Sequence, residues 1–269
     1  MEAINPSLAN ILIALGITTA ASLATALGSL MVFNAKGPNP RLLSFGLAFA
    51  GGAMVYVSLS EILTKSILAF TQAFDSRLGF TYGTLAFLAG MILVAALDRL
   101  VPNPHPAIDK DDHSDHDHRH VKRVGLLTAI AITAHNFPEG LATFFATLEN
   151  PQVGLPLAFA IAIHNIPEGI SIAVPIYHAT GSKKKAFVAS LLSGFAEPVG
   201  AIIGYMLLAP FLTQAVFGAV FGLIAGVMVF LALDELLPTA KKYARGHETV
   251  YGLVLGMAAI AVSLILFRW

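Results

Sequence analysis

Residues 154–178 read GLPLAFAIAIHNIPEGISIAVPIYH, an apolar run long enough to cross a bilayer with histidine, asparagine and glutamate near its centre. The hexapeptide in its middle, HNIPEG at 164–169, repeats HNFPEG at 135–140, which also lies in an apolar run. An ionised side chain at the centre of a membrane helix costs about 2.5–3.5 kcal/mol. Two copies of such a cluster need a compensating partner, and a divalent cation is the obvious one.

The composition indicates a polytopic membrane protein. Hydrophobic residues make up 56% of the 269 positions, charged residues make up 12%, and the mean hydropathy is +0.75. The formal net charge is zero, which argues against nucleic acid or another strongly charged macromolecule as a partner. Cysteine is absent, so disulfides and thiolate metal sites are excluded.

Hydropathy divides the chain into eight predicted membrane helices, because about 20 residues cross the hydrocarbon core of the lipid bilayer. Their ranges are 8–33, 42–64, 80–100, 123–148, 154–178, 186–209, 213–239 and 250–268. The first range has no basic segment before it and is interpreted as a span, not as a cleaved signal. Residues 1–269 are therefore predicted to form a single all-α transmembrane domain.

The basic residues predict the orientation of these spans. With the N-terminus outside, thirteen of the sixteen Lys and Arg residues fall on the inner side, and only Lys65, Arg77 and Arg268 fall outside. Both termini are therefore expected to be extracytoplasmic in a multi-pass protein of the cell inner (plasma) membrane. The fourth and fifth spans then run antiparallel, so the two hexapeptides meet near the midplane in a pseudo-twofold arrangement, as in many transporters.

Each hexapeptide offers three metal ligands on one side of a helix. His135 and Glu139 are four residues apart and share a face, and Asn136 flanks Glu139. Pro138 and Pro167 lack a backbone N–H, which leaves carbonyl oxygens of the preceding turn without their helical donor. Imidazole, carboxylate and amide ligands suit Zn²⁺ or Fe²⁺, and a site without sulfur holds them less firmly than a structural cage does. The metal is accordingly expected as a transported substrate, with no prosthetic group.

Two interpretations without a metal stay open at this point. The polar residues could hydrogen-bond to one another as packing contacts between kinked helices, or they could form a proton relay. The duplicated asparagine fits a ligand set better than a relay.

These features resemble the ZIP (Zrt/Irt-like) metal transporters, and most closely their bacterial ZupT-type branch. The resemblance rests on the paired HNxPEG hexapeptides in the fourth and fifth spans, the eight spans, a histidine-rich inner loop between the third and fourth spans, and an acidic residue in the sixth. It covers essentially the whole chain. It implies a three-plus-two-plus-three helix bundle, uptake of divalent metal toward the cytosol, and often a homodimer.

The resemblance also implies a binuclear metal centre built from three spans. Carried over to this sequence, its ligands are His135, Asn136, Glu139, His164, Asn165, Glu168 and, in the sixth span, Glu197. Glu197 precedes a proline, as the glutamates of the hexapeptides follow one, so exposed carbonyl oxygens are expected near it too.

Each of the other polar residues in the spans has two possible roles. A charge at Glu61, toward the outer end of the second span, could meet lipid headgroups, whereas the resemblance makes it a third metal site or an access carboxylate. Met54 could add a thioether ligand, although a methionine in an apolar span more often belongs to the core. Asp98, Asp234 and Glu235 lie near predicted inner helix ends, where they could form an exit relay or be solvated charges.

The predicted cytoplasmic loop, 101–122, is rich in histidine and aspartate. Positions 109–120 hold five acidic residues and four histidines, a composition that suits weak metal capture without a fold. A cytosolic metal sensor or acceptor and an inert solvated tether are both compatible with it, because the spacing does not define a tetrahedral site.

The sequence therefore predicts a secondary transporter or facilitated carrier, not an enzyme, with zinc, iron and other dications as cargo. A zinc-dependent intramembrane hydrolase would also bury histidines and carboxylates, but the His-Glu-x-x-His pattern is absent. A proton-driven transporter of an organic solute is the third possible class of protein. Competition between Zn²⁺ and the solute for uptake would distinguish it from a metal transporter.

Overall fold

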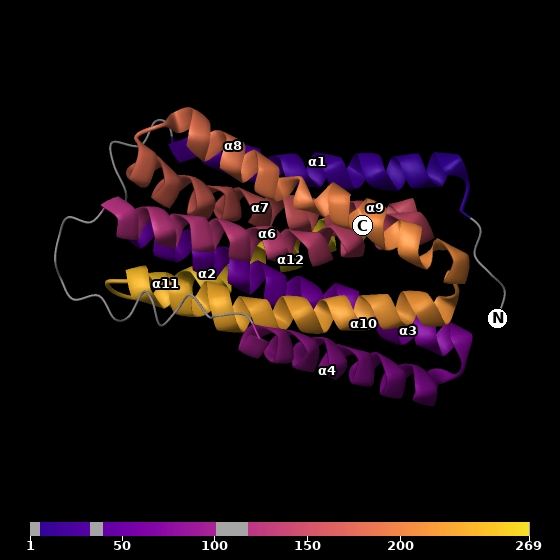
Figure 1. Cartoon of the computed structure of the whole chain (residues 1–269). Coiled ribbons are helices and arrows are strands. Elements are labelled where there is room, and N and C mark those ends of the chain that lie inside the picture. Colours follow the sequence, from indigo (N-terminus) through magenta and orange to yellow (C-terminus); the bar gives the residue numbers. More distant parts are fainter. Residues whose placement is uncertain (1–5, 33–39, 101–117, 269) are drawn as a thin grey trace.

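The computed structural model describes residues 6–32, 40–100 and 118–268, and every regular element in these ranges is a helix. Figure 1 shows the helices running side by side as one elongated bundle. Seven helical segments in the described ranges are long and apolar enough to cross a membrane. They confirm the expected all-α, multi-pass membrane protein, whereas the count of eight spans stays a prediction.

The order of the helices follows the order of the predicted spans. The elements are α1 (Leu8–Val32), α2 (Pro40–Val57), η1 (Ser58–Ile62), α3 (Leu63–Ala73), α4 (Ser76–Leu100), α6 (His118–Glu149), α7 (Pro151–Thr180), α8 (Lys183–Gly194), α9 (Ala196–Leu208), η2 (Ala209–Phe211), α10 (Gln214–Leu231), η3 (Ala232–Leu236), α11 (Leu237–Tyr243) and α12 (Glu248–Arg268). The fourth predicted span, 123–148, falls inside α6, a helix of 32 residues. Of the predicted loop 101–122, residues 101–117 lie outside the described ranges.

The second span is longer than the sequence suggested. The expected range was 42–64, but Pro40–Ala73 forms a continuous candidate span of 34 residues. The polar residues that marked the expected end are buried in the bundle: Lys65 is 8% exposed, and Ser66 donates a hydrogen bond of 2.6 Å to the Gly218 carbonyl. Polar side chains with partners inside the protein do not end a membrane helix.

Two acidic segments lie in π-helical turns inside long helices. Glu61 lies in η1, between α2 and α3, and Asp234 and Glu235 lie in η3, between α10 and α11. The helix continues past η3 through the seven residues of α11, so Asp234 and Glu235 lie farther from a helix end than the sequence suggested. Single π-helical turns inside α-helices often mark functional sites.

A tight hairpin joins α6 to α7. The side chain of Asn150 accepts a hydrogen bond from the backbone N–H of Gln152 and caps α7, and Pro151 fills the first helical position, where no N–H is needed. The two helices therefore run antiparallel and in contact along their length. This arrangement brings the two hexapeptides to the same level of the bundle.

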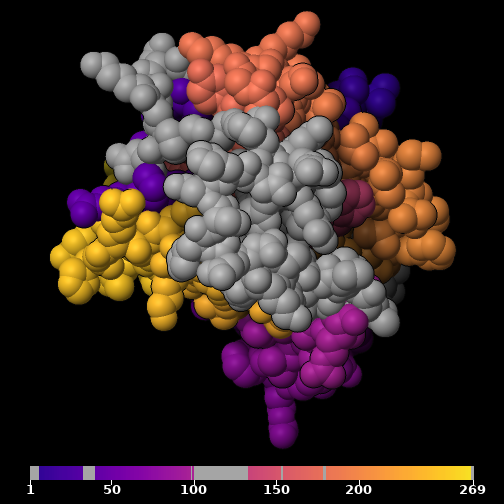
Figure 2. Space-filling view, turned by 60° about the vertical axis from the view of Figure 1, so that its left-hand side comes forward, coloured from indigo at the N-terminus to yellow at the C-terminus, as the bar shows by residue number. Residues whose placement is uncertain are grey.

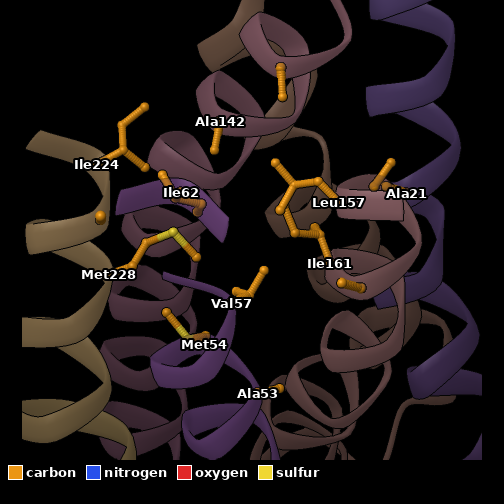
Figure 3. Packing of buried hydrophobic residues seen from close by; sticks show 14 of the residues in the cluster. Ala21, Ala53, Met54, Val57, Ile62, Ala142, Leu157, Ile161, Ile224 and Met228 are labelled. Atoms are coloured by element: carbon orange, nitrogen blue, oxygen red, sulfur yellow. The ribbon is translucent and has the colours of Figure 1, made fainter. Parts of the chain in front are cut away.

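The apolar core joins helices from distant parts of the sequence. Figure 3 shows Val57 and Met54 of α2 between Met228 of α10 on one side and Leu157 and Ile161 of α7 on the other. All five side chains are at most 1% exposed. The second span therefore packs between the α7 hairpin and the seventh predicted span.

Glycines allow the closest helix contacts. A Cβ atom at Gly28 of α1 would overlap the carbonyl oxygen of Ile166 in α7, and one at Gly169 of α7 would overlap the carbonyl oxygen of Thr25. Because helix association in a membrane depends on close packing, these small residues fix α1 against α7 at the level of the second hexapeptide.

We expect Gly28→Ala to destabilise the protein by about 1–3 kcal/mol, the usual cost of an added methyl group in a filled contact. Thermal unfolding of the purified protein in detergent measures the change. Gly16→Ala is the matched control in the same helix, because a Cβ atom at Gly16 meets no atom within 4 Å. Equal stability of the two variants would contradict the close contact between α1 and α7.

Candidate metal centre

One direct contact links the two hexapeptides. The Nε2 atom of His164 in α7 lies 3.1 Å from Oε1 of Glu139 in α6, and both side chains are fully buried. Glu168, one helical turn after His164, completes a cluster in which one ligand atom from each residue lies within 4.8 Å of the others. Two carboxylates and one imidazole from antiparallel helices thus converge on one point, as a divalent cation requires.

A second contact brings the sixth predicted span to this cluster. The amide of Asn165 donates to Oε1 of Glu197 in α9 at 2.6 Å and to the carbonyl oxygen of Ala21 in α1 at 3.2 Å. Glu197 is fully buried, and it lies close enough to Glu139 to feel its charge. Asn165 therefore holds a third carboxylate beside the first two.

The hydrogen bonding of the sixth predicted span has a break next to Glu197. The chain stays helical through Phe195, between α8 and α9, but Pro198 has no N–H for the carbonyl of Gly194. The carbonyl oxygen of Ser193, just before the break, accepts a hydrogen bond of 3.0 Å from the amide of Asn136. The first hexapeptide is thus anchored to the same break that positions Glu197.

Many polar atoms of this region have no hydrogen-bond partner among the described residues. They are both ring nitrogens of His135, both carboxylate oxygens of Glu168, the second carboxylate oxygens of Glu139 and Glu197, Nδ1 of His164, and the amide oxygens of Asn136 and Asn165. Every one of these residues is at most 2% exposed. A buried polar atom without a partner costs about 1–3 kcal/mol, so this many in one place indicates a site for a ligand that accepts electron pairs.

The three carboxylates of this region repel one another when they are ionised. Glu139, Glu168 and Glu197 interact electrostatically with one another, and each is fully buried. Among the described residues, the only buried Lys or Arg is Lys65 of α3, which is in another part of the sequence and no partner of this cluster. Positive charge must therefore come from outside the chain, as protons or as metal ions.

Seven of the eight predicted ligands lie in or beside this region, and Glu61 is apart from the three-residue cluster. Glu61 is half-buried in η1 and interacts with other residues of the structure. Met54 is fully buried in the apolar layer of Figure 3, which agrees with a core position. The side chain of Asp98 lies outside the described residues.

Hydroxyl groups that were not predicted from the sequence lie beside the ligands. The hydroxyl of Ser193 accepts a hydrogen bond of 2.9 Å from Thr133, and Ser190 donates to the carbonyl of Gly169 at 3.1 Å. On α1, Thr18, Ser22, Thr25 and Ser29 are all buried. Their spacing of three and four residues places them on one helix face, and this periodicity was a usable signal.

Comparison with known proteins gives the family of this chain. A family profile described as "ZIP Zinc transporter" matches residues 102–264, more than half of the chain. The chain belongs to the ZIP zinc transporter family. Membership indicates a transporter, not an enzyme, and the profile match includes both hexapeptides and Glu197.

The similarity extends over nearly the whole chain. The chain is 71% identical over 262 residues to "Zinc transporter ZupT" of Xanthomonas campestris pv. campestris, and the match covers 97% of this chain and 96% of the relative. Proteins of the same name from Neisseria meningitidis serogroup B and Streptococcus mutans are 66% and 49% identical, covering 98% and 93% of this chain and 98% and 96% of the relatives.

We expect Glu168→Gln to stabilise the metal-free protein and to remove its stabilisation by zinc. The substitution removes one of three mutually repelling buried charges, and each kcal/mol recovered raises the unfolding temperature by about 2–4 °C. Unfolding is followed in detergent with a chelator and with added Zn²⁺. Glu248→Gln, which alters the pair of Glu248 with the exposed Arg41 at 3.4 Å, is the control that keeps the zinc response. A full zinc response in Glu168→Gln would remove Glu168 from the site.

Proposed function

We propose that this protein takes up Zn²⁺, together with Fe²⁺ and other first-row dications, across the cell inner membrane into the cytosol. The observation that carries the proposal is the buried cluster of Glu139, His164 and Glu168, beside which the described part of the chain places no lysine or arginine. The relatives named zinc transporter support zinc as the cargo.

In this proposal the cargo binds in a binuclear centre. Its ligands are His135, Asn136, Glu139, His164, Asn165, Glu168 and Glu197. The three carboxylates supply the negative charge that offsets the dehydration of two cations, and the imidazoles favour borderline metals over Mg²⁺ and Ca²⁺. The hydrogen bonds of the asparagine amides to Ser193 and Glu197 leave their oxygens, which suit hard cations, directed to the cargo.

An apolar layer separates the cluster from the α6–α7 turn. Leu157 and Ile161 of α7 precede His164 and face Val57 and Met54 of α2 (Figure 3). These side chains are at most 1% exposed, and hydrated ions do not pass a dry apolar contact. Transport therefore requires α2 and α7 to move relative to each other.

The glycine contacts divide the bundle into two bodies that can make this movement. The site body contains α1 and α6 to α9, and the frame body contains α2 to α4 and α10 to α12. Within the site body, a Cβ atom at Gly140 would overlap the Glu197 carbonyl, and within the frame body one at Gly52 would overlap the Leu253 carbonyl. Between the bodies, Gly46 meets only the Cβ atom of Pro167, at an ordinary 3.7 Å. We propose that the site body, with all seven ligands of the centre, moves against the frame body.

The direction of uptake rests on the predicted orientation. Eight spans in the order three, two and three, with both termini extracytoplasmic, place the start of α8 and the end of α11 on the cytoplasmic side. Figure 2 looks onto this end of the bundle, with the start of α8 at the top and α11 at the left. The lysines 183–185, 241 and 242 lie in these segments, in agreement with the positive-inside rule. We propose a homodimer in the bilayer as the working assembly.

Glu139→Ala and Glu168→Ala should each lower the initial rate of ⁶⁵Zn²⁺ uptake by more than about tenfold, which corresponds to a loss of about 1.4 kcal/mol of metal stabilisation. The reason is that an alanine leaves the dehydrated cation without its counter-charge. Uptake is measured in vesicles at equal protein abundance, with Glu248→Gln as the control. Unchanged uptake in either variant would contradict the assignment of the site.

His135→Ala and His164→Ala should shift the selectivity from Zn²⁺ toward Mn²⁺, because removal of an imidazole leaves a set of oxygen ligands. A panel of competing metals measures the order of preference. A lower flux with an unchanged order would show that the histidines are not ligands.

A further inference from the structure

Lys65 is the one buried Lys or Arg side chain in the described part of the chain, at 8% exposure. It lies in α3, in the frame body. It is not a counter-charge of the centre, so the burial of this ammonium group must have another reason. A buried ammonium is stable only beside negative charge.

Two carboxylates provide that charge. Glu61 precedes Lys65 by four residues, about one helical turn, and each of the two takes part in an interaction, so we infer that Glu61 is one source of this charge. Glu149, the last residue of α6, lies close enough to the ammonium group to interact with it electrostatically. We call Glu61, Lys65 and Glu149 the outer charge cluster, since Glu149 ends α6 at the α6–α7 turn.

The cluster joins the two bodies. Glu61 and Lys65 belong to the frame body and Glu149 belongs to the site body. Both neighbouring helices contact α10: Ser66 donates to the Gly218 carbonyl at 2.6 Å, and the ring of Phe145 meets that of Phe217 edge-on, with centroids 5.7 Å apart. The charges are therefore held across a boundary that must open during transport.

The net charge of the outer charge cluster favours dications over monovalent cations. Two carboxylates and one ammonium leave one negative charge, which attracts cations. A dication at the same distance gains twice the Coulomb energy of a monovalent ion. A monovalent ion has no charge advantage over the ammonium group, whose tether keeps it at a high effective concentration.

We propose that Lys65 is a specificity-determining residue, a tethered counter-cation that occupies the outer carboxylates Glu61 and Glu149 until a dication displaces it. Displacement frees Glu149 of the site body from Lys65 of the frame body. Arrival of a dication at the outer end is thereby coupled to the opening of the contact between the bodies. The inference rests on the proposed transport of dications.

The test compares zinc uptake in Na⁺ and in N-methylglucamine at equal ionic strength, so that general screening is constant. We expect the KM of the wild type for Zn²⁺ to be the same in both media. In Lys65→Met, which keeps the apolar stem without the charge, Na⁺ should raise the KM several-fold with little change in kcat. Lys65→Arg, the matched control, should behave as the wild type.

A charge exchange tests the pairing of the two bodies. Lys65→Glu and Glu149→Lys should each impair uptake, and the double variant should recover both uptake and insensitivity to Na⁺. A purely structural lysine would instead lower abundance or thermal stability by the same amount in both media.

The outcomes separate this inference from the function on which it rests. Suppose that the wild type takes up zinc and that the KM of Lys65→Met for Zn²⁺ is equal in Na⁺ and in N-methylglucamine. This result would overturn the role of Lys65 and would not affect the proposed transport function. No zinc uptake by the wild type would overturn the proposed function. No recovery in the double variant would overturn the pairing of Lys65 with Glu149.

Discussion

Three carboxylates, Glu139, Glu168 and Glu197, are buried together in a bundle whose described residues place no lysine or arginine beside them. Each would be costly alone at this depth, and their mutual repulsion adds to the cost. Only protons or metal cations can lower both the cost of burial and the repulsion between the carboxylates. The α6–α7 hairpin, the break at Phe195 and the amide of Asn165 all serve to hold these groups at one point, so most features of the site body follow from this constraint.

The metal centre and the outer charge cluster differ in the source of their positive charge. The centre has excess negative charge and takes its counter-ions from outside the chain, whereas the outer charge cluster includes its own cation, Lys65. The first arrangement favours occupation by metal, and the second allows occupation only by an ion that competes successfully with an ammonium group. The apolar layer of Leu157 and Ile161 lies between the centre and the α6–α7 turn, so in the proposed transport an ion reaches the centre only when the bodies move.

Much of this could be predicted from the sequence, because polar residues in long apolar runs are few and their spacing fixes a helix face. The hexapeptides and Glu197 were found in this way. The length of the second span was not, since Lys65 and Ser66 look like the end of a membrane helix until their partners are known. The π-helical turns at Glu61 and at Asp234 were missed for a similar reason: one extra residue in a turn leaves no mark on hydropathy. Electrostatic interactions such as that of Lys65 with Glu149 join residues far apart in the chain and require the fold.

The central claim is that dications bind between the two hexapeptides. An anomalous difference map from crystals grown with Zn²⁺, recorded on both sides of the zinc absorption edge, tests it most directly. We predict a peak enclosed by Glu139, His164 and Glu168, with nitrogen and oxygen ligands at about 2.0–2.2 Å from the metal. Zinc found only elsewhere in the protein, with these three side chains still hydrogen-bonded to one another or to water, would contradict the account.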